Sequence, residues 1–148
     1  MKFILLVLIL AIIAAVYLYF ENHFILAKRH KDFGGDVKIL HISDCHKRNN
    51  STYNKRILSA AQLEKPDLIF ITGDFVSRTE TDFSLCEAFL HGLFEIAPVY
   101  LCMGNHEQSF IHDNQQEFLD AMHRTKAEIL INSGRHVKIK GREFYICG

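Results

Sequence analysis

Eighteen consecutive residues near the amino terminus carry no charge, and no other feature restricts the fold of the chain as strongly. The run covers residues 3–20 and reads FILLVLILAIIAAVYLYF. As a helix it would nearly cross the ~30 Å hydrocarbon layer of a membrane, and residues 22–27 can extend it. Tyr17 and Tyr19 suit the headgroup boundary. We therefore predict a transmembrane anchor over residues 1–27, a linker over 28–36 and a separate domain over 37–148.

A cleaved signal peptide is the alternative interpretation of this segment. Its apolar part would normally be shorter and would end at a small-x-small cleavage site. Tyr-Leu-Tyr-Phe-Glu stands there instead, which favours an uncleaved, single-pass anchor. Lys28, Arg29 and Lys31 follow the span, so the positive-inside rule favours the cytoplasm for the domain. A signal-anchor inserted the other way would place the domain outside.

The overall composition narrows the classes of partner. Lys and Arg together number 17, as do Asp and Glu, so the formal net charge is zero and no basic field for nucleic acid is expected. The four cysteines form no C-x-x-C pair, and we expect them to be reduced core residues. Nine histidines in 148 residues raise the question of a metal site.

Beyond the linker, strand and helix patterns alternate. Apolar runs predict strands, and apolar stripes at helical spacing predict helices. The predicted strands cover residues 37–42, 68–72, 98–103 and 128–132, the helices cover 51–63, 81–94 and 112–123, and a hairpin joins 137–140 to 143–147. This order predicts an α/β fold whose sheet begins parallel, with helices packed on it.

Polar side chains follow each of the first three predicted strands. Asp44 and His46 follow the first, Asp74 follows the second, and Asn105 and His106 follow the third. The steps from Asp44 to Asp74 and from Asp74 to Asn105 are 30 and 31 residues, about one βα unit each. Because ligands bind at the carboxyl ends of strands in open α/β sheets, we expect these groups to gather at one edge.

The residue types indicate metal chemistry. Asp44 and His46 are two positions apart, so an extended strand end would point both to the same side, with Cys45 pointing away. Mixed oxygen and nitrogen ligands suit manganese, iron or zinc better than calcium. Gly73 and Gly104 permit tight turns and allow a phosphate to approach the backbone.

The stretches DCH, GD and GNHE, in this order and spacing, resemble the first three signatures of the calcineurin-like metallophosphoesterases. The chain resembles in particular their membrane-anchored bacterial branch, over about residues 37–148. The resemblance implies the amino-terminal half of a layered α-β-β-α sandwich, preceded by one transmembrane helix. It also implies hydrolysis of phosphate esters or phosphoanhydrides with two divalent metal ions, most typically Mn, Fe or Zn.

The family pattern implies a role for each site residue. Asp44 and His46 would bind one ion, Asp74 would bridge both ions, and Asn105 would bind the second. His106 would lie beside the leaving group, as general acid or as a stabiliser of the transferring phosphoryl group.

The neighbours of these residues have implied roles of their own. Glu107 would orient His106 or shape the turn. Lys47 and Arg48 would attract the substrate's phosphate or form only a solvated loop.

The later family motifs, Gly-His and Gly-His-x-His, do not occur in this sequence. The last residues, REFYICG, have the pattern of a buried strand, so we expect the amino-terminal half of a longer enzyme, weakly active or inactive alone. The alternative is a non-catalytic, membrane-tethered binding module. A nucleotide, a lipid-linked diphosphate and a cell-wall phosphodiester are all compatible substrates, and an anchor favours the lipid-linked or envelope ones. The sequence does not indicate an oligomeric state.

Overall fold

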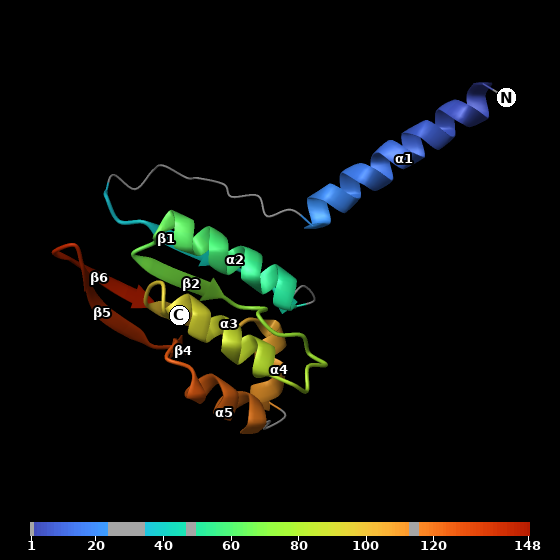
Figure 1. Cartoon of the computed structure of the whole chain (residues 1–148). Helices are drawn as coiled ribbons and strands as arrows, with labels where there is room; N and C mark the ends of the chain where they lie inside the picture. The colour runs from blue at the N-terminus through green and yellow to red at the C-terminus, as the bar shows by residue number, and fades with distance from the viewer. Residues whose placement is uncertain (1, 24–34, 47–49, 113–115) are drawn as a thin grey trace. The chain divides into compact units, whose positions relative to one another are not determined.

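The computed structural model describes residues 2–23, 35–46, 50–112 and 116–148. The chain consists of two compact units, with the boundary between Gly34 and Gly35. The first contains helix α1 (Lys2–His23), drawn in blue in Figure 1. The predicted linker over 28–36 lies mostly outside the described residues, so the three domain boundaries stay predictions.

Helix α1 is apolar on all sides. Its residues Phe3–Phe20 have a mean hydropathy of 3.0, and none of them is buried within the chain. A helix of 22 residues is about 33 Å long at 1.5 Å per residue. It is therefore long and apolar enough to cross a membrane, although a signal sequence would meet the same criteria.

The second unit is a mixed α/β domain, which confirms the predicted fold class. Its parallel sheet has the order β1-β2-β3-β4, with strands β1 (Ile39–Ile42), β2 (Leu68–Thr72), β3 (Val99–Cys102) and β4 (Glu128–Leu130). The connecting helices are α2 (Ser51–Glu64), α3 (Ser84–Phe94), α4 (Asn105–His112) and α5 (Gln116–Arg124). Figure 1 shows α2 and α3 lying along one face of the sheet.

The burial of the strands follows from this arrangement. Ile69, Ile71, Val99 and Leu101 are at most 2% exposed and form the centre of the core. The alternate residues Phe70 and Tyr100 on the other face are only half-buried. Parallel strands in α/β proteins carry apolar residues on both faces, which is why the continuous apolar runs in the sequence predicted these strands.

Helix boundaries differ from the prediction mainly around the third crossover. One helix was predicted over residues 112–123, whereas α4 ends at His112 and α5 begins at Gln116. Helix α4 was missed because its first residues, NHEQ, read as a turn. Its sequence NHEQSFIH has apolar residues only at the adjacent positions Phe110 and Ile111, which form no apolar stripe to reveal a helix. Phe110 stacks on Phe118 of α5, with ring centroids 5.2 Å apart.

The last two strands, β5 (Gly134–Ile139) and β6 (Arg142–Cys147), form the predicted hairpin. The prediction of a buried final strand was wrong, because within the described part of the chain β6 pairs only with β5 and most of its residues are exposed. Its apolar residues 144–147, FYIC, resembled a core strand, but the hairpin forms a separate two-stranded sheet that buries neither face fully.

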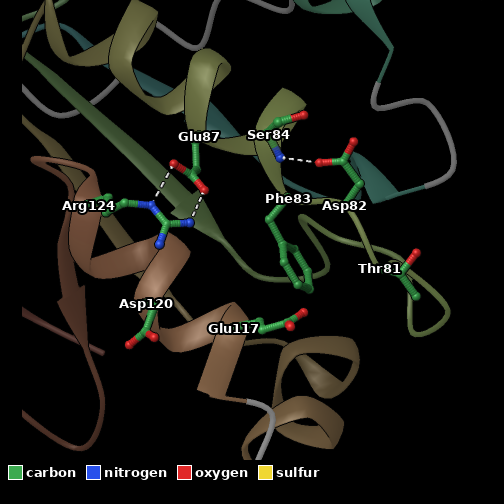
Figure 2. A pocket seen from close by; sticks show the side chains of 8 residues that line it. All are labelled: Thr81, Asp82, Phe83, Ser84, Glu87, Glu117, Asp120 and Arg124. Carbon is green, nitrogen blue, oxygen red and sulfur yellow. Dashed lines mark hydrogen bonds and ion pairs between the residues drawn. The ribbon is translucent and has the colours of Figure 1, made fainter.

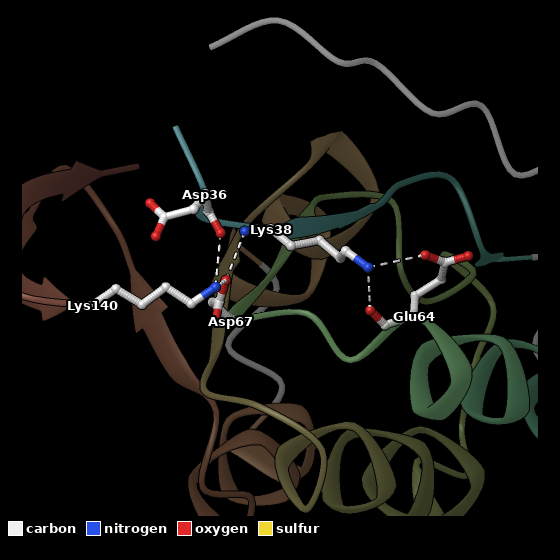
Figure 3. Close-up of polar contacts among 5 residues, drawn as sticks. All are labelled: Asp36, Lys38, Glu64, Asp67 and Lys140. Carbon is white, nitrogen blue, oxygen red and sulfur yellow. Dashed lines mark hydrogen bonds and ion pairs between the residues drawn. The ribbon is translucent and has the colours of Figure 1, made fainter. Parts of the chain in front are cut away.

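Polar contacts connect the hairpin to the sheet at the end opposite the predicted site (Figure 3). The ammonium group of Lys140 donates to Asp67 Oδ2 and to the Asp36 carbonyl, each at 2.7 Å. Asp67 Oδ2 also accepts from the backbone N–H of Lys38 at 2.7 Å, and Lys38 Nζ donates to the Glu64 carbonyl at 2.6 Å. The Lys140 hydrogen bond, followed by that of Lys38, holds the pKa of the Asp67 carboxyl below its usual value.

Candidate metal centre

The loops that follow β1 and β2 are joined at the carboxyl edge of the sheet by backbone hydrogen bonds. The N–H of Asp44 donates to the Gly73 carbonyl at 3.3 Å, and that of His46 donates to the Asp74 carbonyl at 3.0 Å. The parallel register brings the strand ends together, so these loops meet as the sequence predicted.

The second and third loops touch through two glycines. A Cβ atom at Gly73 would lie 2.5 Å from the Gly104 nitrogen, and one at Gly104 would clash with the nitrogen and Oδ1 of Asp74. Gly73 also has a φ of +89°, in the region that favours glycine. Both positions therefore require glycine, because the backbones of the two loops approach each other closely there.

Asp74 lies at the centre of the hydrogen bonds in this region. Its Oδ1 accepts from the backbone N–H of His106 at 3.1 Å. With the Asn105 amide oriented to satisfy both of its ends, its nitrogen donates to Asp74 Oδ1 at 2.7 Å and Oδ2 at 2.9 Å. The Asn105 oxygen then accepts from Arg78 Nη2 at 2.7 Å, so this amide would have to turn over to present its oxygen to an ion beside Asp74.

His106 is held in one tautomer by its surroundings. Its Nδ1 lies 3.2 Å from the Val76 carbonyl, which can only accept, so Nδ1 carries the proton of the neutral ring. Nε2 is therefore the nitrogen that can receive or deliver a proton. The ring lies against that of His46, with centroids 4.6 Å apart.

His46 has the property expected of a metal ligand. Its Nδ1 is buried and makes no hydrogen bond within the described residues. Buried polar atoms are nearly always satisfied, so an unsatisfied ring nitrogen packed against His106 is consistent with a metal-binding role for His46. The donor set of carboxylate, imidazole and amide fits Mn, Fe or Zn.

Asp44 follows β1 as predicted, but the predicted alternation of Asp44 and His46 along an extended strand end is not found. Strand β1 ends at Ile42, and Asp44 has a left-handed φ of 57°, so the alternation of an extended strand does not extend to His46. Asp44 is exposed, and its Oδ2 accepts from the Ser43 hydroxyl at 2.5 Å. Cys45 is buried in the core, as predicted.

Glu107 is the residue whose role was least visible in the sequence. It is 1% exposed, and its carboxylate accepts four backbone N–H groups, those of Asp74, Phe75, Val76 and Gly104, at 2.6–2.9 Å. Of the two implied roles, orienting His106 or shaping the turn, the structure shows the second. Backbone donors have no sequence signature, so only the structure could show this contact.

Some of the predicted site residues contact one another directly, and others are connected only through the backbone. Asp74, Asn105 and His106 contact one another directly, His46 contacts His106, and Asp44 is connected through its backbone. Over the described ranges, no three His, Cys, Asp or Glu side chains converge closely enough to hold an ion. Lys47 and Arg48 lie outside the described residues, whereas Arg78, which was not predicted, reaches the site through Asn105.

A separate hollow of about 400 Å³ lies between α3 and α5 (Figure 2). Half of its lining residues are acidic, and the lining consists of Thr81, Asp82, Phe83, Ser84, Glu87, Glu117, Asp120 and Arg124. Glu87 accepts hydrogen bonds from Arg124 Nε at 3.0 Å and Nη2 at 2.5 Å, so the main cation of the hollow is already paired. The hollow includes none of the predicted site residues.

Loops at the carboxyl ends of the strands thus bring carboxylates, imidazoles and an amide to one edge of the sheet. Residues 37–144 match the model of the calcineurin-like phosphoesterase family, and the chain belongs to that family. A similar curated protein is Phosphodiesterase YaeI of Escherichia coli strain K12, which is 28% identical over 122 residues. The match covers 80% of this chain and 45% of YaeI, so the chain spans less than half the length of that relative.

Proposed function

We propose that this chain hydrolyses phosphodiesters with divalent metal ions held at the carboxyl edge of its sheet. The observation that carries the proposal is the orphaned Nδ1 of His46, which lies on the ring packed against His106 and beside the loop of Asp74. Family membership and the name of the relative YaeI support phosphoester chemistry in general. The two-metal mechanism is our inference from the residue set.

Asp44 and His46 would hold one ion, Asp74 would bridge to a second, and Asn105 would complete the second set after its amide turns. The ions would supply Lewis-acid activation of the phosphoryl group and of water. His106, with protons on both ring nitrogens, would deliver the Nε2 proton to the departing oxygen and be left as the neutral ring whose Nδ1 proton the Val76 carbonyl accepts. Four protein ligands shared by two ions leave many coordination positions open, so we expect slow turnover.

The phosphorylated substrate would be small or lipid-linked, and it would be reached from the membrane if α1 is retained as an anchor. Helix α1 supports this placement by its length and its uniformly apolar surface. We propose a single-pass location near the amino terminus, in the membrane-anchored branch of the family.

Hydrolysis of bis(p-nitrophenyl) phosphate by the full chain in detergent with Mn²⁺ tests the function. We expect slow turnover that chelation with EDTA abolishes. Asp74→Asn should reduce kcat/KM by at least about 10–100-fold, because it weakens the bridging ligand. Asp120→Asn, in the acidic hollow, is the control and should retain the wild-type rate. Equal rates for Asp74→Asn and wild type would overturn the proposal, and a chain that binds Mn²⁺ without turnover would favour the binding module.

A further inference from the structure

The Glu107 carboxylate is shared between two loops that each carry candidate ligands. Oε2 accepts from the N–H groups of Asp74 and Gly104, both at 2.8 Å, and so joins the loop after β2 to the loop after β3. Oε1 accepts from Phe75 at 2.6 Å and Val76 at 2.9 Å. One buried side chain thus satisfies four donors that no strand or helix would otherwise satisfy.

These contacts fix the backbone next to the chemistry. Asp74 supplies a donor itself, and Gly104 immediately precedes Asn105. Val76, which donates its N–H to Glu107, uses its carbonyl to hold His106 Nδ1. Phe75 and Val76 are each 1% exposed, so the segment bound by Glu107 is also anchored in the core.

We infer that Glu107 is a positioning residue, which keeps Asp74, Asn105 and His106 at one point of the sheet edge before any metal binds. This inference rests on the proposed function for its catalytic consequence. Backbone N–H groups that converge on an anion form strong, short hydrogen bonds, and each is directional. Together these hydrogen bonds fix the distance between the two loops. A metal site requires this distance to be set before the ion binds.

The carboxylate is needed because it only accepts hydrogen bonds. A glutamine has the same shape, but its amide nitrogen would face two of the four N–H groups as a donor. Those two donors would then be buried without a partner, and the loops would separate or shift to regain one. Aspartate keeps the charge but is one methylene shorter, so it should restore part of the contact.

The experiment compares wild type, Glu107→Gln and Glu107→Asp, each as the full chain in detergent. Glu87→Gln is the matched control, because Glu87 also accepts two hydrogen bonds but from Arg124, outside these loops. Amide hydrogen exchange of Asp74, Phe75, Val76 and Gly104 reports the loop contact without metal or substrate. Mn²⁺ affinity by electron paramagnetic resonance and the kcat and KM for bis(p-nitrophenyl) phosphate report its consequence.

For Glu107→Gln we expect faster exchange at those four amides, with β2 amides unchanged, and Mn²⁺ affinity weaker by about 10–100-fold. The kcat should fall more than KM rises, and Glu107→Asp should lie between the two. Unchanged exchange at the four amides would overturn the inference, as would wild-type Mn²⁺ affinity in Glu107→Gln. A wild type that binds no Mn²⁺ would instead overturn the proposed function, and the positioning role with it.

Discussion

Gly104 shows how little space separates the residues of the site. Alanine there would place its Cβ against the nitrogen and Oδ1 of Asp74, which are backbone and a bonded carboxylate rather than a flexible chain end. We expect Gly104→Ala to lower the free energy of unfolding by about 1–3 kcal/mol, the usual cost of overpacking. It should also weaken Mn²⁺ binding, because Asp74 must move.

Thermal unfolding and Mn²⁺ titration of Gly104→Ala test this expectation. Gly141→Ala is the control, since the φ of +82° at Gly141 would strain an alanine but nothing lies within 4 Å of an added Cβ. It should lose stability through backbone strain alone and keep its Mn²⁺ affinity. Equal Mn²⁺ affinity in both alanine variants would show that the contact between the loops does not position Asp74.

The identities of the candidate ligands could be read from the sequence, but their surroundings could not. Asp74 and His106 stand out because each follows an apolar run, whereas the tautomer of His106 depends on the carbonyl of Val76. The approach of Gly73 to Gly104 depends on the register of β2 and β3. Backbone contacts between segments that are far apart in the sequence leave no recognisable pattern of residue types, so only the fold shows them.

Among the elements, the hairpin of β5 and β6 is connected to the sheet by contacts that should weaken in acid. Because its folded-state pKa is lowered, ionised Asp67 stabilises the fold fully above the ordinary aspartate pKa. This contribution is lost as the pH falls through the lowered value. The Lys140 and Asp67 side chains are 44% and 20% exposed, so we expect less than about 1 kcal/mol.

Unfolding of Lys140→Ala at pH 6 and pH 3 measures this contribution. The variant should be less stable than wild type at pH 6, and the difference should narrow at pH 3, because below the ordinary aspartate pKa of 3.8 the unfolded chain binds a proton that folded Asp67 resists. Lys126→Ala is the control, because its ammonium lies 4.0 Å from Glu95 and both side chains are more than half exposed. A destabilisation of Lys140→Ala that is the same at both pH values would show that packing, and not the charge pair, connects the hairpin.

Some helices and strands could be predicted from the sequence and others could not, and the difference has a physical cause. Strands β2 and β3 were found because their runs are apolar throughout and begin next to prolines 66 and 98. Helix α2 was found because its residues recur at helical spacing, and Asn50 caps its start by accepting from the Tyr53 N–H at 3.0 Å. The exposure of β6 could not be predicted, since apolar alternation does not say what covers a strand.

For the molecule as a whole, the open test is whether α1 anchors the chain in a membrane. Ile12 lies near the middle of the apolar run and is exposed in the chain itself. Arginine at this position would cost about 2.5–3.5 kcal/mol at a bilayer centre. We expect wild type to resist extraction from membranes by alkaline carbonate and Ile12→Arg to be extracted more readily. A mature product that lacks residues 3–20 by mass would show a cleaved signal instead.

The central claim is that the carboxyl edge of the parallel sheet binds divalent cations. Anomalous diffraction from crystals of the full chain soaked in Mn²⁺ tests this claim most directly. We expect a manganese peak in contact with Asp74 and His46, and its loss in Asp74→Asn. A peak only in the acidic hollow of Glu117 and Asp120, with none beside Asp74, would contradict it.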